Sequence, residues 1–277
     1  MRQLIALGTA VFVLTGCKKD SIYTNLTASS PQNNAQNSGY KLAWSDEFNY
    51  TGLPDPLKWG YEHGYVRNNE KQYYEEARLE NSQVKNGHLI INARNDNYNS
   101  HAITSASVIT KDRMQFLYGR IEVSARMPVG AGSWPAIWTL GINRGKVDWP
   151  NCGEIDIAEW VGRSPRIILG SMYMPGGLLG YTAKITTYDV GNNNTLSARF
   201  HTYSIEWDSA QIRYFYDGYN YATYKAAGMT AKQWAPFMKP HYLLLNLAIG
   251  GTSGGPVDDT KFPFTYEVDY VRYYQKQ

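Results

Sequence analysis

The stretch Gly153-Glu154-Ile155-Asp156-Ile157-Ala158-Glu159-Trp160 places three carboxylates within six residues of an apolar, β-branched run. β-Branched residues favour strands, and residues i and i+2 of a strand share a face. Glu154 and Asp156 therefore point one way, while the isoleucines that follow them point into a core. Strict alternation would send the third acid, Glu159, to the core side as well. We predict one extra, bulged residue at position 157 or 158, which returns Glu159 to the face of the other acids.

Three carboxylates on one face are chemically informative because like charges repel and burying an unpaired carboxylate is unfavourable. Stability alone therefore does not select the arrangement. Retaining glycoside hydrolysis does require it: a nucleophile, a general acid/base and a neighbour that separates their pKa values. The alternative is a solvated strand face whose acids pair with Lys or Arg. Acids are depleted in strands and no basic residue alternates with these, so the catalytic interpretation is favoured.

The same stretch resembles the active-site signature of glycoside hydrolase family 16 in its bulged form, Glu-x-Asp-x-x-Glu, shared by laminarinases and many agarases and carrageenases. Further blocks, in the same order along residues 40 to 275, resemble the β-glucanase branch. These blocks are Trp44–Phe48, Asn68–Tyr74, Asn86–Ile91, Tyr118–Glu122, Trp134–Trp138, Phe200–Tyr203 with Glu206 and Trp207, Leu245–Gly251, and Val268–Arg272. The resemblance implies an all-β jelly-roll sandwich of two curved antiparallel sheets, with a substrate cleft on the concave sheet.

Roles for the three acids follow from the resemblance. It implies that Glu154 is the nucleophile and that Glu159 is the acid/base that protonates the leaving oxygen and later activates water. Asp156 lies between them, and its charge can help Glu159 hold a proton near neutral pH. No cofactor is implied for catalysis.

Strand-like runs separated by turn-forming residues recur along the chain, a pattern typical of a β-sandwich. The runs are His88–Ala93, Gly119–Arg126, Ala136–Leu140, Gly153–Trp160, Ile167–Met174, Phe200–Asp208, Gln211–Tyr216, His241–Ile249 and Tyr266–Tyr274. Asp217-Gly218 is a specific hairpin signal, and Thr230 to Trp234 predicts one short helical turn. A sandwich of this length commonly forms a single domain, which we place at residues 40–277.

Tryptophans near the acids are candidate sugar contacts. Trp134 and Trp138 are four apart on a predicted strand, so they share a face on which indole planes can stack on sugar rings. Trp149 leads into the acidic stretch and is a third candidate. The remaining tryptophans are expected to pack in the core: Trp44, Trp59, Trp160, Trp207 and Trp234.

Polar cleft positions are implied by the resemblance alone. They are Asn69, Glu70, His201 and Asn246, together with Tyr173, which stands where laminarinases usually carry a histidine. Asn69, Glu70 and Asn246 could equally be turn or capping residues, and His201 could be an interior structural histidine. The segment Gly176–Gly180 is a loop that could border the cleft.

The charge of the segments expected to border the cleft bears on the substrate. Ser133–Thr139, Trp149–Trp160 and Ser171–Gly180 contain no Lys or Arg, which suits uncharged glucose units, whereas sulfated sugars favour basic residues. Arg67, Arg113 and Arg144 could approach from loops. We expect endo-cleavage of β-glucans that contain 1,3-linkages, either laminarin or mixed-linkage 1,3/1,4-glucan. An agar- or carrageenan-type hydrolase, a transglycosylase and a non-catalytic glycan-binding lipoprotein remain alternatives.

Other ligands are constrained by composition and spacing. A net charge of +3, with no Lys/Arg-rich run, argues against nucleic acid, and we expect a monomer. No His/Cys cluster has zinc spacing. The resemblance implies a structural Ca²⁺ held by Glu47, the Gly87 carbonyl and Asp269, although ordinary surface carboxylates are the alternative for these acids. Cys152 is expected to be buried and inert.

The amino-terminal residues predict export and lipid anchoring. Arg2 precedes the apolar run Leu4–Leu14, which is too short to span a membrane, and Leu14-Thr15-Gly16-Cys17 resembles a bacterial lipoprotein signal. The expectation is a signal peptide at 1–16, acylation of Cys17 and a flexible polar tether at 17–39. Lys18-Lys19-Asp20 resembles surface-export signals of Bacteroidetes lipoproteins. We therefore place the protein at the outer-membrane surface, with the periplasmic face left open.

Overall fold

The computed structural model describes residues 39–191 and 195–277. The predicted signal peptide at 1–16, the acylated Cys17 and the tether up to residue 38 lie outside the described residues. Within the described ranges, no helix is long and apolar enough to cross a membrane.

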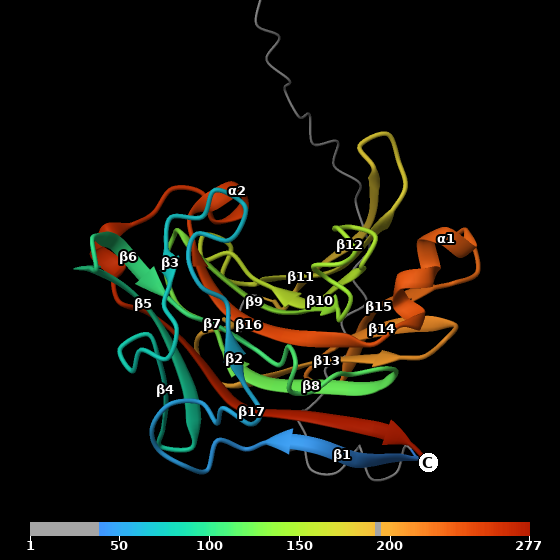
Figure 1. Ribbon diagram of the computed structural model, residues 1–277, viewed down its shortest axis with the longest axis horizontal. Helices are drawn as coiled ribbons and strands as arrows, with labels where there is room; N and C mark the ends of the chain where they lie inside the picture. Colours follow the sequence, from blue (N-terminus) through green and yellow to red (C-terminus); the bar gives the residue numbers. More distant parts are fainter. Residues whose placement is uncertain (1–38, 192–194) are drawn as a thin grey trace, which may run out of the picture. The chain divides into compact units, whose positions relative to one another are not determined.

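Two β-sheets, stacked one above the other in Figure 1, make up the described chain and confirm the all-β sandwich expected from the sequence. The larger sheet has the order β15 (Tyr219–Lys225), β14 (Gln211–Tyr216), β13 (His201–Trp207), β8 (Gly119–Arg126), β17 (Phe264–Lys276), β5 (His88–Tyr98), β6 (His101–Ser105) and β3 (Tyr73–Tyr74); β1 (Tyr40–Asp46) pairs with β17, and β4 (Ser82–Lys85) with β5. The smaller sheet has the order β12 (Tyr181–Asp189), β11 (Ile167–Pro175), β10 (Glu154–Glu159), β9 (Ser133–Gly141), β16 (His241–Ile249), β7 (Ser107–Ile109) and β2 (Gly60–Tyr61).

Helical structure in the described ranges is limited to short turns. These are α1 (Ala231–Trp234), α2 (Gly251–Gly254) and the 3₁₀ turns η1 (Ala235–Met238) and η2 (Asp259–Lys261). The predicted turn at Thr230 is confirmed as α1, because the Thr230 hydroxyl caps the backbone N–H of Gln233 and the Gln233 side chain accepts from Thr230 N–H. The predicted hairpin is also confirmed: Asp217 and Gly218 join β14 to β15 with φ of 45° and 81°.

The core lies between the two sheets, where the apolar faces of alternating strands meet. Trp59, Trp160 and Trp207 are almost completely buried there, and Trp234 is buried beside Phe237. Trp44 packs edge-on against the ring of Trp59, at a centroid distance of 5.9 Å. All five tryptophans assigned to packing are therefore packing residues.

Three strands of the smaller sheet, β2, β7 and β12, were not predicted from the sequence, and the longest of them is β12. Its residues are mostly polar and partly exposed because it is the edge strand, so the apolar run that marks a buried strand is missing. The segment Gly176–Gly180 forms the turn between β11 and β12, and Gly176 N–H donates to the carbonyl of Gly180. Leu178 and Leu179 are exposed at its tip.

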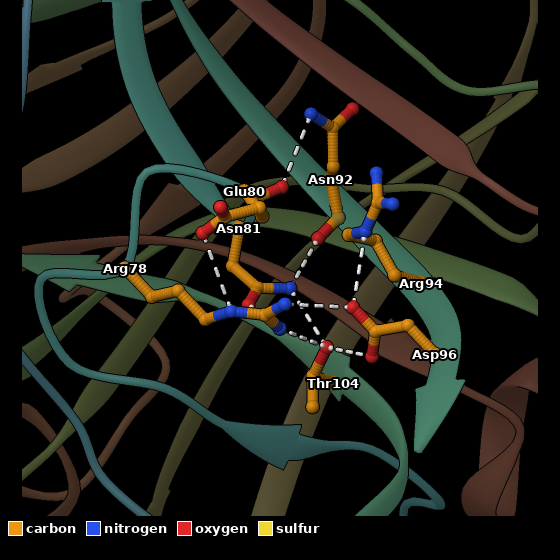
Figure 2. A network of polar contacts seen from close by, with 7 residues as sticks. All are labelled: Arg78, Glu80, Asn81, Asn92, Arg94, Asp96 and Thr104. Atoms are coloured by element: carbon orange, nitrogen blue, oxygen red, sulfur yellow. Dashed lines mark hydrogen bonds and ion pairs between the residues drawn. The ribbon is translucent and has the colours of Figure 1, made fainter. Parts of the chain in front are cut away.

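The hairpin of β5 and β6 is fixed by a partly buried polar network, shown in Figure 2. Asp96 accepts hydrogen bonds from Arg78, Arg94 and Thr104 at 2.9, 3.1 and 3.0 Å. Burial opposes ionisation of Asp96, but these donors outweigh it and hold its pKa below the usual range. Asn81 is fully buried and donates to Thr104. The network secures β6, with which the short strand β3 pairs.

Candidate active site

The bulge predicted in the acidic strand is present in β10. Asp156 lies opposite Trp138 on β9 and Ala158 lies opposite Ile137, so Ile157 has no partner on that strand. On the β11 side, three residue steps from Asp156 to Glu159 oppose two steps from Ser171 to Leu169. The extra residue resets the alternation, and Glu154, Asp156 and Glu159 all line one cleft of about 650 Å³.

The cleft lies on the smaller sheet, and its floor follows from cross-strand register. Residues opposite one another in antiparallel strands share a face. Leu140, Trp138 and Ala136 of β9 lie opposite the three acids of β10, so they face the cleft as well. The remaining lining residues come from neighbouring strands and loops: Arg67, Asn68, Glu70, Trp134, Arg144, Trp149, Leu169, Tyr173, Tyr181, Ile185, Asn246, Ala248, Thr252 and Ser253.

Each acid has a specific hydrogen-bond donor. The Nε1–H of Trp149 donates to Oε2 of Glu154 at 2.8 Å, and the Nε1–H of Trp134 donates to Oε1 of Glu159 at 3.0 Å. The hydroxyl of Ser171 donates to Asp156. Trp134 and Trp149 therefore orient the two outer carboxylates through their indole N–H groups, whereas only stacking was expected of them.

The protonation of the three acids follows from burial and mutual repulsion. Burial, followed by the charge of Glu159, raises the pKa of Glu154 to about 7, while Trp149, Arg67 and Asp156 act in the opposite direction. Burial and both neighbouring charges raise the pKa of Asp156 well above its ordinary value, so it holds a proton that it donates toward Glu154. Burial also raises the pKa of Glu159, opposed only by its Trp134 bond. The pKa of each acid is therefore raised, and Glu154 has more contacts that favour its anion, from Trp149, Arg67 and Asp156, than Glu159 has from Trp134 alone.

Replacing Asp156 with Asn should stabilise the fold while impairing activity. The folded-state pKa of Asp156 is raised, so its proton stabilises the fold at low pH and this contribution is lost as pH rises through that pKa. An amide keeps the shape and has no charge to bury. We expect Asp156→Asn to raise the free energy of unfolding at pH 8 by about 0.5–2 kcal/mol, with a smaller gain at pH 4, in urea titrations.

Asp217 provides the matched control for this substitution. Hydrogen bonds from His201 and Thr202 outweigh burial and lower the pKa of Asp217, so Asp217→Asn should destabilise the fold at pH 8. A loss of stability at pH 8 in the Asp156 variant would contradict the assignment of a raised pKa.

A polar network borders the cleft on the side away from β11. Glu70 accepts hydrogen bonds from Asn68, Gln72 and Tyr74 at 3.2, 2.7 and 3.2 Å. The Asn246 amide donates to the Tyr74 hydroxyl at 2.9 Å. The structure therefore brings Glu70 and Asn246 to the cleft, as expected from the sequence.

Two predicted polar positions lie elsewhere. Asn69 is exposed and does not line the cleft; it forms a turn with Asn68, at φ of 52° and 57°, and Asn68 takes the cleft position. His201 is buried in β13 of the larger sheet, where it contacts Asp217 at 2.8 Å and the Tyr216 hydroxyl at 2.7 Å. Its role is structural because the other sheet carries the cleft.

Two arginines bring positive charge to the cleft. Arg67 and Arg144 both line it from loops, an approach that the sequence analysis left open. Arg67 is paired with Glu62, and Arg144 lies 3.5 Å from the exposed Asp148. Arg113 instead donates to the Pro56 carbonyl outside the cleft.

Tyr181 is a further cleft residue that the sequence did not reveal. It lies at the start of β12, so it was missed together with its strand. A tyrosine that begins a polar edge strand has no local signal that distinguishes it from a surface residue.

The residues suggested for calcium do not form a favourable site. Both oxygens of Glu47 accept hydrogen bonds from the Arg272 guanidinium, at 2.9 and 2.8 Å, and Asp269 accepts one from Ser124. A carboxylate neutralised by a guanidinium is a poor ligand, so the geometry does not favour Ca²⁺ at Glu47, Gly87 and Asp269. In residues 39–191 and 195–277, no group of three His, Cys, Asp or Glu side chains could hold a metal ion.

Cys152 is fully buried two residues before Glu154. Burial raises the pKa of its thiol to about 11, so it stays protonated and unreactive at neutral pH. The prediction that Cys152 is buried is confirmed, and the raised pKa agrees with an unreactive thiol.

Comparison with known proteins identifies the family. Residues 69–272 match the family described as Glycosyl hydrolases family 16. The chain belongs to this family. Among family 16 relatives, a β-glucanase of Rhodothermus marinus is 42% identical over 250 residues, covering 85% of each chain. The X-ray structure of the laminarinase from Rhodothermus marinus superposes with a TM-score of 0.79 at 42% identity, covering 85% of this chain and 97% of that one. A non-specific endo-β-1,3(4)-glucanase of family 16, SCLam, gives a TM-score of 0.78 at 37% identity, covering 87% and 92%.

Proposed function

We propose that the protein is a retaining endo-β-glucanase that hydrolyses β-glucans containing 1,3-linkages. The observation that carries this proposal is the set of three acids that the β10 bulge brings to one cleft, each with its own hydrogen-bond donor. The choice of glucan is supported by the β-glucanase and laminarinase relatives, whose likeness extends over most of both chains.

In the proposed mechanism, the two outer acids take the roles that the family 16 signature implies. An oxygen of ionised Glu154 attacks the anomeric carbon, the glycosidic C–O bond breaks, and the leaving oxygen takes the proton of Glu159. The resulting glycosyl ester on Glu154 is hydrolysed when Glu159, now a carboxylate, removes a proton from water that attacks the same carbon. Asp156 donates a hydrogen bond to Glu154, which favours the anion before attack and its departure afterwards.

Aromatic rings on the β11 side of the acids provide a surface for sugar rings. Trp149, Tyr173 and Tyr181 lie with ring centroids 5.2 to 6.1 Å apart, and Trp149 is 37% exposed. Apolar sugar faces stack on such rings, while the polar network around Glu70 offers acceptors on the opposite side. The cleft therefore combines a stacking wall with a hydrogen-bonding wall.

The substrate class is tested by initial rates on laminarin, mixed-linkage 1,3/1,4-glucan, agarose and carrageenan, with the products sized. We expect cleavage of one or both glucans to short oligosaccharides, and slower or no cleavage of the galactans. Faster cleavage of carrageenan or agarose would overturn the glucanase proposal, and binding without cleavage would favour a glycan-binding protein. Products longer than the starting oligosaccharide would favour transglycosylation.

Tyr173 should contribute to the choice between the two glucans. Its ring lies opposite Glu154 in the β10–β11 register and belongs to the stacking wall. We expect Tyr173→His to change the ratio of initial rates on laminarin and mixed-linkage glucan by at least about threefold, because ring contact and reach both change. Tyr219→His, at an exposed tyrosine outside the cleft, is the control. An unchanged ratio in the Tyr173 variant would contradict the role of Tyr173 in the choice of glucan, and would leave the glucanase proposal intact.

We propose in addition that the mature protein is held at the bacterial outer-membrane surface by lipid on Cys17, after removal of residues 1–16. The support is the sequence pattern around Cys17 and the polar composition of residues 17–39. Cys17→Ala should release soluble, active enzyme or block processing, as judged by detergent partitioning and mass of the amino-terminal peptide. A processed Cys17 variant that still requires detergent would contradict the anchor.

A further inference from the structure

Arg67 lies on the loop between β2 and β3 and is fixed against the wall of the cleft. Its guanidinium carbon is 4.8 Å from the ring centroid of Trp138. Its Nη2 donates to Glu62, and the other carboxylate oxygen of Glu62 accepts a hydrogen bond from Ser107 at 2.6 Å. Two contacts of different kinds, an ion pair and a cation–π contact, therefore hold the guanidinium in one place.

The position of Arg67 changes the part that Trp138 can play. Trp138 is 7% exposed, its Nε1–H donates to Asn246 at 2.7 Å, and the Arg67 guanidinium lies over its ring. An indole covered in this way offers little surface for a sugar ring. Trp138 was expected to stack on sugar, but a ligand at this point of the cleft meets the guanidinium as well.

Arg67 also has unused hydrogen-bonding capacity. Its Nη1 is buried and has no acceptor in the part of the chain that the structure describes. Leaving a charged N–H unpaired is unfavourable. The Arg67 side chain as a whole is 21% exposed and lines the cleft, so a ligand hydroxyl that meets the exposed part of the guanidinium would gain a strong hydrogen bond. Glu70, whose carboxylate lies in the same cleft, supplies an acceptor nearby.

We propose that Arg67 is a substrate-binding and specificity-determining residue, which donates to a hydroxyl of the sugar unit bound beside Trp138. This inference rests on the proposed function, because the ligand is the same uncharged β-glucan chain. Sugar recognition then differs on the two sides of the acids: stacking on Trp149, Tyr173 and Tyr181, and hydrogen bonding to Arg67. A donor that requires a particular hydroxyl rejects a sugar lacking it far more strongly than an apolar surface does.

Binding is best measured where turnover is blocked. In the Glu154→Gln background, the affinity for a β-1,3-linked glucose tetrasaccharide is measured by titration calorimetry, with and without Arg67→Met. We expect Arg67→Met to weaken binding roughly 10- to 100-fold, as for a lost hydrogen bond to a charged group. Arg113→Met removes a guanidinium outside the cleft and should leave the affinity unchanged. Equal affinities with and without the Arg67→Met substitution would overturn the proposal.

A second variant separates binding from support of the loop. Arg67→Lys keeps a cation beside Trp138 but lacks the planar fork, so we expect an intermediate loss of about 3- to 10-fold with an unchanged Tm. In otherwise active enzyme, both variants should raise KM more than they lower kcat. If Arg67→Met does not fold but Arg67→Lys does, the affinity of the Lys variant is the test. An affinity equal to that of the protein with Arg67 would overturn the inference. A wild-type enzyme that cleaves no β-glucan would overturn the proposed function itself, and with it the role of Arg67.

Discussion

Glu154→Gln is expected to lower the turnover of β-glucan by at least about 10⁴-fold, the largest effect of any single substitution considered. The amide keeps the size of the side chain and can still contact the Trp149 indole, but it cannot attack the anomeric carbon. Initial rates on polymer, with a chromogenic aryl glycoside in parallel, measure the loss. Both substrates should be affected because each requires the nucleophile.

The fold and glucan binding should survive this change. Thermal unfolding by circular dichroism and calorimetric binding of an oligosaccharide are the controls. Glu75→Gln is a matched substitution of a buried glutamate outside the cleft, and it should leave turnover largely intact. Near-normal activity in a folded Glu154→Gln enzyme would exclude Glu154 as nucleophile.

Glu159→Ala is expected to lower polymer hydrolysis by about 10²- to 10⁴-fold, the range attributed to a general acid. The effect should depend on the leaving group. An activated aryl glycoside needs little protonation, so formation of the glycosyl intermediate from it should be much less impaired. Hydrolysis of this glycosyl intermediate should then be slow, because no base remains to activate water.

Azide makes the Glu159 prediction decisive. A small anion needs no general base and can attack the anomeric carbon of the intermediate in the space left by the alanine. Adding azide to Glu159→Ala with the aryl glycoside should accelerate turnover and yield a β-glycosyl azide, identified by NMR. A product of α configuration would contradict retention, and absence of any azide product would contradict the assignment of Glu159.

The acidic strand was predictable because a single short segment contains all the information. Alternation with a period of two, broken at one residue, requires a bulge if the three acids are to share a face. The strands β8, β14 and β16 were likewise bounded correctly, since buried or alternating apolar runs end at clear turn residues. The edge strand β12 lacked that signal.

The contacts between side chains from distant segments were not predictable. Trp138 and Arg67 lie far apart in the sequence, and nothing local indicates that a guanidinium covers the indole. Trp134 and Trp149 were placed correctly at the cleft, but their N–H bonds to the acids depend on ring orientation. His201 was misplaced because a histidine in a strand carries no sign of which sheet it joins.

The unpaired residue at position 157 makes the catalytic centre sensitive to chain length as well as to residue type. Deleting Ile157 would leave all three acids on a strict two-residue period, and Asp156 and Glu159 could keep Trp138 and Ala136 as their partners on β9. The deletion would instead destabilise the core, because it removes the Ile157 side chain, which is 1% exposed. Inserting one further residue between Asp156 and Glu159 would instead turn Glu159 away from the cleft. A proton donor can therefore be lost from this enzyme by a change of length alone, with every catalytic residue type still present in the sequence.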